Sequence, residues 1–327
     1  MKALQILEPG RSAIVDIPAP KPEPNEALVQ IEAVTTCPHW DMHILGGQPM
    51  FAGGALDYPY TVGQPGHEAV GRVVATGSKV TTVSEGQRVC VWRDRGHDVQ
   101  GCYAEYVAAD EAVLIPAPEG LPSEALAPLE LAMCVSVHIL FAEKLAALRG
   151  KRVGVFGLGP AGLVCVQLAR AGGAADVLAF DPLPQRRALA SGFGAACALD
   201  PTDPKAMAQV PPRNANGALD ACFDCAGTVG AVRAAMAITR ELVVLFAVQR
   251  EPYTFLPEYW GGLVLAGAQP HTREGAERAM THIRNGELDL RTLVTHTLPL
   301  SEYSRAVALL KNQEALKIAL VPGDVVQ

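Results

Sequence analysis

Short runs in which apolar and β-branched residues alternate with polar ones dominate the first third of the chain. They cover residues 26–34, 69–77, 87–92 and 103–110. A two-residue period of this kind is typical of strands with one buried face. Clusters of proline and glycine, such as PAPKPEPN, separate the runs. The pattern predicts a small barrel-like β domain.

The pattern changes near Leu121. Residues 122–150 favour a helix, with Ser123 as its N-cap and Gly150 as its stop. Strands and helices then alternate, which predicts a parallel sheet covered by helices on both faces. The predicted strands are residues 151–157, 175–181, 196–200, 217–227, 241–248 and 262–268, and the predicted helices are residues 160–173, 183–194 and 228–240.

The last part of the chain resumes a mixed pattern. It predicts a helix at 273–288, a strand at 293–300, a helix at 301–313 and a strand at 317–323. Because this order of elements differs from the regular strand–helix alternation before it, we expect the segment to return to the first domain.

Composition and charge narrow the possible functions. The chain has 327 residues, 49% of them hydrophobic and 19% charged, which suits two domains with large cores. The net charge of −7 argues against nucleic acid or an anionic membrane as the main partner. We see neither a signal-peptide core nor an apolar run of membrane-spanning length, so we expect a cytoplasmic protein. The eight cysteines are scattered, which does not suggest a disulfide framework.

A glycine-rich turn lies between a predicted strand and a predicted helix. Gly157, Gly159 and Gly162 have G-x-G-x-x-G spacing, and Pro160 and Ala161 open the helix. In this context the first glycine makes a tight turn and the second lets the backbone approach a pyrophosphate. The helix N-terminus then offers free N–H groups to the phosphates. The alternative is a glycine-rich turn without a ligand.

An acidic residue follows this turn at the distance that a dinucleotide site requires. Asp181 ends the next strand, 19 residues after Gly162. An acid there accepts hydrogen bonds from the ribose hydroxyls and repels a 2′-phosphate, so we favour NAD(H) over NADP(H). Arg186 and Arg187 follow closely and leave NADP(H) open.

Side chains of the kinds that bind zinc occur together in two short motifs. Cys37 opens the polar run CPHWDMH, and His67 and Glu68 follow a glycine in PGHE. Thiolate, imidazole and carboxylate are all zinc ligands. Glu130 is a fourth candidate, which would approach from the domain junction. The alternatives are that His67 is a satisfied histidine in a turn, that Glu130 is a surface carboxylate, and that Cys134 replaces Glu130.

Further motifs connect these sites along the chain. They are Cys37 followed by Asp41 and His43, then GHE at 66–68, VATGSKVTTVSEGQRV, GCYAEYV, GLGPAG, FDCAG, and the closing LVTHTLPLSE and KIALVPG. In this order, and over essentially the whole chain, they resemble the zinc-containing alcohol and polyol dehydrogenases of the medium-chain dehydrogenase/reductase superfamily. Each motif alone is weak, but the combination is specific.

The resemblance implies an α/β fold with two domains. A GroES-like β-barrel-type catalytic domain would occupy residues 1–122. A Rossmann domain with a doubly wound parallel sheet would occupy residues 123–268, and residues 269–327 would return to the catalytic domain. Ala226, Val248, Arg186 and Lys317 complete the cofactor-binding residues that we predict beside the glycine-rich turn and Asp181.

The resemblance also implies a metal centre and its chemistry. One catalytic zinc would be bound by Cys37, His67 and Glu130, with Glu68 near or on the metal. Zinc would polarise the substrate oxygen, a relay would remove the hydroxyl proton, and the hydride would pass to the nicotinamide. The chain lacks the four-cysteine lobe that holds a structural zinc in many members, so we expect no second zinc.

The proton relay departs from the family pattern. Asp41 is expected to hydrogen-bond the far side of His67 and fix its tautomer, and His43 to end the relay. The family usually has a serine or threonine in C-x-[ST]-D-x-H, whereas this chain has one extra residue and no hydroxyl there. His39 either takes over the relay or faces solvent, and Trp40 is expected to line the substrate pocket.

We therefore expect a zinc- and NAD-dependent dehydrogenase that acts on a secondary alcohol, a polyol, a sugar-like substrate or the corresponding ketone. One alternative is a zinc-free NAD(P)H-dependent reductase of the same fold, although such members usually lack the cysteine and the His-Glu pair. Another is a non-catalytic, nucleotide-binding regulatory protein, which the altered relay permits. Residues 262–268 form an apolar sheet edge that family members pair across a dimer, so we expect a homodimer or homotetramer.

Overall fold

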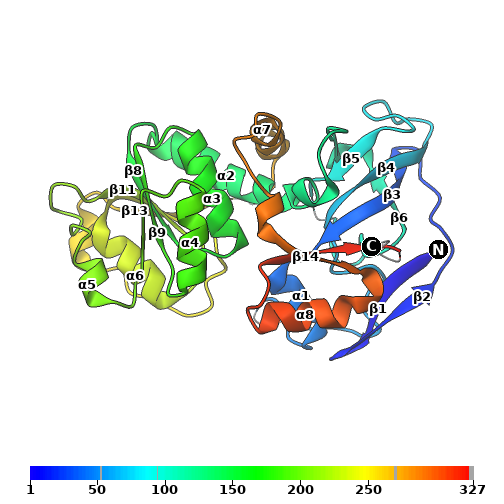
Figure 1. Cartoon of the computed structure of the whole chain (residues 1–327), viewed down its shortest axis with the longest axis horizontal. Coiled ribbons are helices and arrows are strands. Elements are labelled where there is room, and N and C mark those ends of the chain that lie inside the picture. The colour runs from blue at the N-terminus through cyan, green and yellow to red at the C-terminus, as the bar shows by residue number, and fades with distance from the viewer. Residues whose placement is uncertain (52–53, 94, 269–270, 324–327) are drawn as a thin grey trace. The chain divides into compact units, whose positions relative to one another are not determined.

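The computed structural model describes residues 1–51, 54–93, 95–268 and 271–323. The chain forms two compact units, and Figure 1 labels most of their helices and strands. The first unit joins Met1–Leu131 to Asp289–Gln327, and the second comprises Ala132–Leu288.

A seven-stranded sheet forms the frame of the first unit, in the order β14-β15-β3-β4-β5-β7 with β6 paired to β3. Along β3, Ala27, Val29 and Ile31 are buried in alternation, as the two-residue period predicts. The antiparallel pairing of β15 with β3 brings the end of the chain back to its beginning. The strands are β3 (Glu26–Thr35), β4 (Glu68–Thr76), β5 (Arg88–Val91), β6 (Tyr106–Asp110), β7 (Leu114–Pro116), β14 (Val294–Pro299) and β15 (Lys317–Val321).

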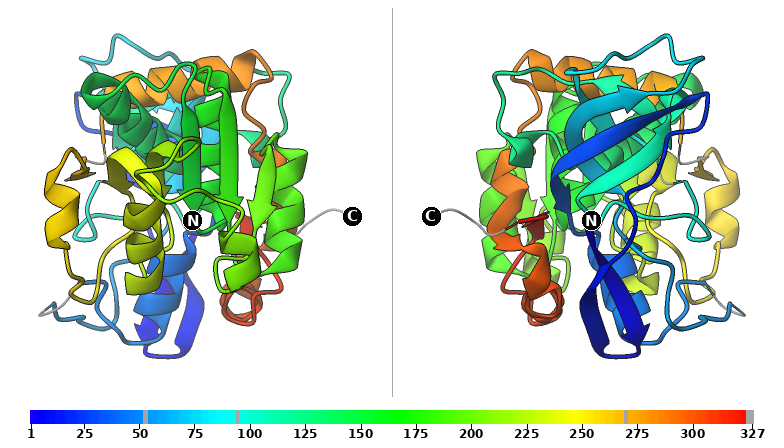
Figure 2. Two further views of the ribbon diagram at one scale, coloured as in Figure 1. Left: turned by 90° about the vertical axis from the view of Figure 1, so that its left-hand side faces the viewer. Right: turned by 90° about the vertical axis from the view of Figure 1, so that its right-hand side faces the viewer.

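Several elements of this unit are additions to the predicted ones. A hairpin of β1 (Lys2–Glu8) and β2 (Arg11–Asp16) is the dark blue ribbon of Figure 2. Helix α1 (Pro38–Leu45) covers most of the polar run CPHWDMH, and it packs against α8 (Tyr303–Lys311). Short 3₁₀ turns complete the unit: η1 (Glu111–Val113), η2 (Ser123–Ala125), η4 (Arg291–Leu293) and η5 (Leu300–Glu302).

The second unit is built on a six-stranded sheet in which every pairing is parallel. Its strands are β8 (Arg152–Phe156), β9 (Asp176–Phe180), β10 (Cys197–Leu199), β11 (Leu219–Asp224), β12 (Thr239–Leu245) and β13 (Val264–Gly267). The helices are α2 (Leu129–Leu145), which begins in the first unit, α3 (Pro160–Ala171), α4 (Pro184–Gly192), α5 (Pro204–Met207), α6 (Val229–Ile238) and α7 (Arg273–Arg284), with the 3₁₀ turn η3 (Pro257–Trp260).

The strand order β10-β9-β8-β11-β12-β13 is that of a doubly wound Rossmann sheet. From β8 the chain first moves one way along the sheet and then, from β11, the other way. Because parallel crossovers are right-handed, α3 and α4 cover one face and α6 the other. The reversal between β8 and β11 is the place where such sheets bind ligands. The predicted parallel sheet and fold class are therefore confirmed.

The division between the units differs from the predicted boundary at residue 268. Helix α7 belongs to the second unit, because it packs closely against α2. A Cβ on Gly275 would lie 2.6 Å from Val137 Cγ2, so only glycine permits this approach. Arg278 also forms a bidentate ion pair with Glu143, at 2.6 and 2.8 Å. The return to the first unit comes only at Asp289.

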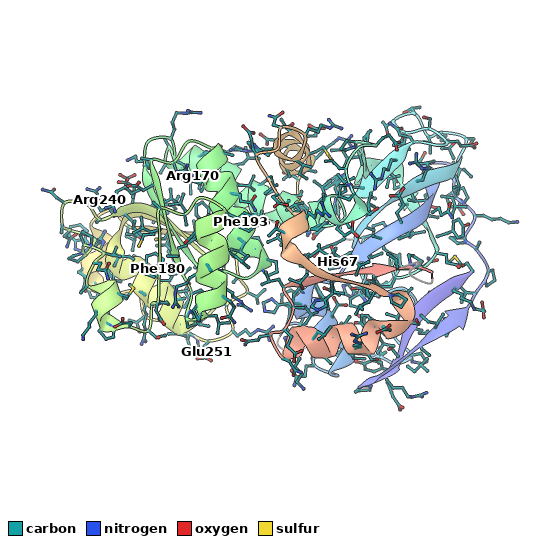
Figure 3. The ribbon with its side chains drawn as sticks, in the orientation of Figure 1. His67, Arg170, Phe180, Phe193, Arg240 and Glu251 are labelled. Atoms are coloured by element: carbon teal, nitrogen blue, oxygen red, sulfur yellow. The ribbon has the colours of Figure 1, made fainter. Side chains whose placement is uncertain are left out.

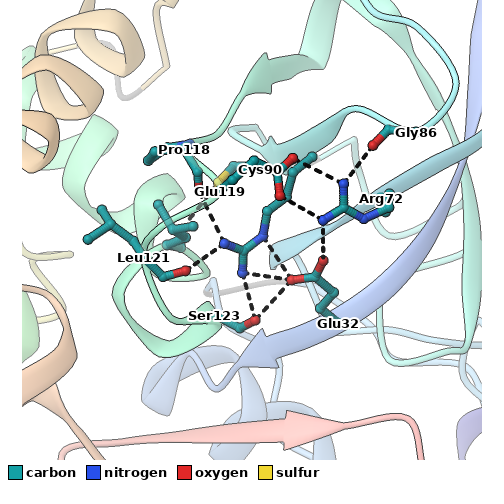
Figure 4. A network of polar contacts seen from close by, with 10 residues as sticks. Glu32, Arg72, Gly86, Cys90, Pro118, Glu119, Leu121 and Ser123 are labelled. Carbon is teal, nitrogen blue, oxygen red and sulfur yellow. Dashed lines mark hydrogen bonds and ion pairs between the residues drawn. The ribbon is translucent and has the colours of Figure 1, made fainter.

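The first boundary lies at Leu131 rather than at residue 122, because a buried arginine ties the connecting segment to the first sheet. Arg88 donates to the carbonyls of Pro118 and Leu121 and to Ser123 Oγ, and it pairs with Glu32 at 2.7 Å (Figure 4). Ser123 Oγ itself donates to Glu32. The Ser123 hydroxyl therefore holds Arg88 and Glu32 together and does not cap a helix, although the sequence predicts an N-cap there.

The predicted helix from Ser123 to Gly150 is also shorter than expected. Ser123 begins the 3₁₀ turn η2, and α2 runs only from Leu129 to Leu145. Pro128 separates them, since a proline disfavours helical geometry in the residue before it. By length and composition Ser123–Leu145 is apolar enough to cross a membrane, which our sequence inspection missed. However, 72% of the apolar 18-residue stretch within it is buried inside the protein, as in a core helix.

Candidate metal and nucleotide sites

The sheet of the first unit brings the predicted metal ligands together. Antiparallel pairing of β3 and β4 places Thr35 opposite Glu68. Cys37 lies two residues beyond the end of β3 and is the N-cap position of α1, while His67 directly precedes β4. Residues far apart in sequence therefore meet at one end of this strand pair.

The ligand atoms of Cys37, His67 and Glu68 all lie within 4.8 Å of one another. His67, labelled in Figure 3, is buried, as is Glu68. Glu130, in the first turn of α2, is outside this group of three, but its Oε2 lies 3.7 Å from His67 Nε2. Three of the four predicted ligands are thus buried in the first unit, and Cys37 beside them is half-buried.

The tautomer of His67 follows from its hydrogen bond. Nδ1 lies 2.8 Å from the carbonyl oxygen of Pro65, which can only accept, so Nδ1 carries the proton. The lone pair is therefore on Nε2, the atom nearest Glu130. A backbone carbonyl that fixes the imidazole in this way is a usual feature of histidine metal ligands.

Glu68 is held by a buried ion pair. Lys317 Nζ lies 2.6 Å from Glu68 and also donates to the carbonyl of Thr36, and Thr35 Oγ1 donates to Glu68 Oε2. Burial raises the pKa of Glu68, and the charge of Lys317 opposes this effect. Because Glu68 already has these partners, Glu130 is the better candidate for a permanent ligand. Lys317, which we expected at the cofactor, is instead committed to Glu68.

The expected hydrogen bond from Asp41 to His67 is wrong for this structure. Asp41 Oδ2 accepts the backbone N–H of Cys37 at 2.7 Å, and Oδ1 accepts the hydroxyls of Tyr103 and Tyr303, each at 2.9 Å. The physical reason is the helix: Asp41 lies one turn after Cys37 and points back to the start of α1. Burial raises the pKa of Asp41 to about 6, although the hydrogen bonds from both tyrosines lower it.

The aromatic side chains of α1 differ in their exposure and in their neighbours. His39 is exposed, and its ring lies 6.4 Å from that of His43. Trp40 is half-buried. Its ring is tilted by 35° against that of His97, with the ring centroids 4.2 Å apart, and it meets the Phe51 ring edge to face at 6.0 Å. One helix therefore carries the Cys37 cap, a buried carboxylate and two neighbouring histidines.

The glycine-rich turn of the second unit has the geometry that its spacing predicts. Gly157 has a φ of +84°, which favours glycine, and a Cβ there would lie 2.8 Å from the backbone of Ala226. A Cβ on Gly162 would lie 1.8 Å from the carbonyl oxygen of Gly157. Gly159 is the N-cap position of α3, with open space where a Cβ would be, and Pro160 is in the first turn. The free N–H groups of α3 thus face an accessible turn.

The ends of the neighbouring strands meet beside this turn. Asp224 ends β11 and accepts the N–H groups of Ala226 and Gly227 and the side-chain amide of Gln249. A Cβ on Gly227 would lie 2.8 Å from the carbonyl oxygen of Val248. Ala226 and Val248 therefore lie in one region of the second unit, at the carboxyl ends of β11 and β12.

Asp181 is buried at the end of β9 and supports the turn itself. Its Oδ2 accepts the N–H of Leu158 at 2.8 Å and its Oδ1 that of Leu183 at 2.9 Å. A carboxylate has about four lone-pair sites, so two hydrogen bonds leave acceptor capacity for a ribose. The Arg186 guanidinium lies 3.8 Å from Asp181 Oδ2.

Comparison with known proteins gives consistent matches over both units. Residues 23–119 match the family model of the alcohol dehydrogenase GroES-like domain, and residues 160–256 match that of the zinc-binding dehydrogenases. An alcohol dehydrogenase of Cupriavidus necator is 29% identical, over 98% of this chain and 99% of its own length. An L-threonine 3-dehydrogenase of Bacillus licheniformis is 27% identical, over 96% of each chain.

The chain belongs to the zinc-containing alcohol and polyol dehydrogenases of the medium-chain dehydrogenase/reductase superfamily. The fold agrees with this family. The crystal structure of 2R,3R-butanediol dehydrogenase from Bacillus subtilis superposes with a TM-score of 0.84 at 22% identity, covering 98% of this chain and 99% of that one.

The donor set of this dehydrogenase fits the metal of its family. Cys37 and His67 offer a thiol sulfur and an imidazole whose lone pair the Pro65 carbonyl leaves on Nε2, and carboxylates of Glu68 and Glu130 lie beside them. Sulfur, nitrogen and carboxylate oxygen are the donors that zinc takes.

Sequence inspection missed the residues that support these ligands. Tyr103, Tyr303 and Thr35 bind the carboxylates of Asp41 and Glu68. Tyr103 lies within GCYAEYV and Tyr303 within the closing motif, so their places were visible. Their roles were not visible, because a buried tyrosine hydroxyl finds its partner only through tertiary contacts.

Proposed function

We propose that this protein is a zinc-dependent oxidoreductase that transfers a hydride between a nicotinamide cofactor and a secondary alcohol, a polyol or a sugar-like substrate, or the corresponding ketone. The observation that carries this proposal is the group of Cys37, His67 and Glu68, with ligand atoms within 4.8 Å, in a chain that also has a dinucleotide-type turn. Bound zinc would act as a Lewis acid on the substrate oxygen, and the nicotinamide would accept or supply the hydride.

The roles of the chain's own residues follow from their contacts. Cys37, His67 and Glu130 would hold the metal. Glu68, paired with Lys317, would place a carboxylate beside the metal and so change the charge around it. One zinc per chain is the proposal, since no four-cysteine lobe occurs in the sequence.

Two residues of α1 are proposed for proton transfer. His43 would form the outer end of a relay, and His39 would stand in for the missing hydroxyl. Asp41 is proposed as a positioning residue for Cys37, because it accepts the N–H of that residue and is itself held by Tyr103 and Tyr303.

NAD(H) is the proposed cofactor. Gly157, Gly159 and Gly162, with Pro160 and Ala161, would hold the pyrophosphate, and Asp181 the ribose. Asp181 is buried and retains acceptor capacity, and a carboxylate at this place disfavours a 2′-phosphate. Arg186, 3.8 Å from Asp181, is the residue through which NADP(H) would be accommodated. Ala226 and Val248 would complete the cofactor site.

We also propose a homodimer or homotetramer. Strand β13 is at the edge of the second unit's sheet, and Val264 on it is 47% exposed. An exposed apolar edge strand is a liability unless another chain covers it. A cytoplasmic location stays a prediction from the sequence.

A substrate screen under metal control tests the proposed function. The full-length protein would be assayed with NAD(H) and with NADP(H) on matched alcohols and ketones and on activated alkenes. Each assay would be run as purified, after chelation, and after zinc is returned. Turnover that is lost on chelation and restored by zinc supports the proposal. Turnover of activated alkenes that is indifferent to chelation would instead indicate a zinc-free reductase. Tight NADH binding without turnover on any substrate would indicate a regulatory protein.

A further inference from the structure

A buried carboxylate in the second unit joins two loops at the carboxyl ends of neighbouring strands. Asp224, at the end of β11, accepts the backbone N–H groups of Ala226 and Gly227 from the loop that follows it. From the loop that follows β12, Gln249 Nε2 donates to Asp224 at 2.7 Å and to the carbonyl of Ala247 at 3.0 Å. The Gln249 amide thus has an acceptor for each of its two protons.

The two loops also meet through their backbones. The N–H groups of residues 246–247 donate to the backbone carbonyl of Asp224, each at 3.0 Å. Gly227 has a φ of +70°, and a Cβ there would lie 2.8 Å from the carbonyl oxygen of Val248. The bond from Gln249 is the next attachment along the chain after these contacts. It therefore sets the course of the segment beyond residue 247.

The strand order places these loops beneath one half of a dinucleotide. Each half of a doubly wound sheet takes one mononucleotide, and the two halves meet where the strand order reverses. In this chain the reversal lies between β8 and β11. Asp181, at the end of β9, is the proposed acceptor for the ribose of the adenosine half. The nicotinamide half, which exchanges the hydride, would then lie over the carboxyl ends of β11 and β12.

We propose that Gln249, held by the Asp224 carboxylate, is a positioning residue for the nicotinamide half of the cofactor. This inference rests on the proposed function, because it takes the bound ligand to be NAD(H). A hydrogen bond to a buried carboxylate is stronger than one between neutral groups, so the Gln249 contact makes residues 246–249 a fixed support. A fixed support keeps the reactive carbon in one place relative to the substrate, and a small displacement there slows the reaction.

The comparison of NADH with ADP-ribose isolates this role. ADP-ribose has the adenosine, the pyrophosphate and the second ribose, but it has no nicotinamide ring. The variant Gln249→Met keeps the approximate length and volume of the side chain and removes its amide donors. Isothermal titration of the full-length protein should show NADH bound about tenfold more weakly by Gln249→Met, and ADP-ribose bound within about twofold of the wild type. On any alcohol that the wild type oxidises, kcat should also fall about tenfold.

Asp220→Asn provides a matched control on the same strand. Asp220 is also a buried carboxylate of β11, but it accepts the backbone N–H of Arg152 at the amino ends of the strands. Its substitution removes a comparable hydrogen bond at the opposite edge of the sheet. Asp220→Asn should therefore bind NADH and ADP-ribose like the wild type, even where it lowers the melting temperature.

The outcomes separate the positioning role from the proposed activity. An unchanged NADH affinity in Gln249→Met, or an equal loss for NADH and ADP-ribose, would overturn the inference. The expected difference between the two ligands, without turnover of any alcohol by the wild type, would leave the role of Gln249 standing and refute the proposed dehydrogenase. A wild type that binds neither ligand would refute the proposed cofactor and the inference together.

Discussion

Alanine substitutions at two glycines of the same turn should separate packing from cofactor binding. A Cβ on Gly162 would lie 1.8 Å from the carbonyl oxygen of Gly157, a distance that no rotamer change relieves. Gly159 has a φ of −68° and nothing within 4 Å of an added Cβ, so alanine fits there without strain. The same chemical change is therefore harmful at one position and harmless to folding at the other.

The expected magnitudes follow from these contacts. Overpacking of this kind costs about 1–3 kcal/mol, which for a unit of this size lowers the melting temperature by about 2–12 °C in Gly162→Ala. Gly159→Ala should melt like the wild type. Its methyl group would nevertheless stand where the backbone approaches a pyrophosphate, so NADH should bind at least about tenfold more weakly, about 1.4 kcal/mol.

Two assays decide the outcome. Thermal unfolding followed by circular dichroism reports stability, and NADH fluorescence titration reports affinity. If Gly162→Ala melts with the wild type, the packing argument is refuted. If Gly159→Ala binds NADH as tightly as the wild type, the turn does not hold the pyrophosphate, whatever its sequence spacing suggests.

Three further substitutions test the first unit. Lys317→Met leaves Glu68 buried without its partner, so urea unfolding should show a loss of about 3–5 kcal/mol; a normal midpoint would contradict a structural ion pair. Tyr303→Phe removes one hydrogen bond to Asp41 and should cost about 1.5–3 kcal/mol in the same assay, while an unchanged midpoint would mean that this bond is not formed. His39→Ala should lower kcat by between about tenfold and about 100-fold, with zinc retained. This is below the roughly 100- to 10,000-fold effect of a complete general acid–base contribution. A kinetically silent variant would remove His39 from the relay.

The elements of the second unit were predictable because its residues follow local rules. Strands buried on both faces give continuous apolar runs such as the VGVF of β8, and the Gly157 turn has a spacing set by its own backbone geometry. The missed features depend on distant contacts. The span of α7 looks like part of the returning tail, and only its packing on Val137 and the Glu143 pair assign it to the second unit.

The metal residues show the same division between local and distant information. Cys37, His67 and Glu68 carry a recognisable chemical signature, and the pairing of β3 with β4 explains their meeting. The partner of Asp41 could not be read from the sequence, because it depends on α1 being a helix. That helix turns the carboxylate toward the N–H of Cys37 instead of toward His67.

Metal content of the wild type and of Cys37→Ala is the most direct test of the central claim, that Cys37 and His67 hold a catalytic zinc. Elemental analysis after gel filtration should find about one zinc per chain in the wild type and little in Cys37→Ala, since a catalytic site has three protein ligands and loses affinity with any of them. Cobalt substitution should show a thiolate-to-metal absorption band in the wild type that is missing in Cys37→Ser. Zinc retained at full occupancy in Cys37→Ala, or a wild type that binds no zinc after reconstitution, would contradict the account.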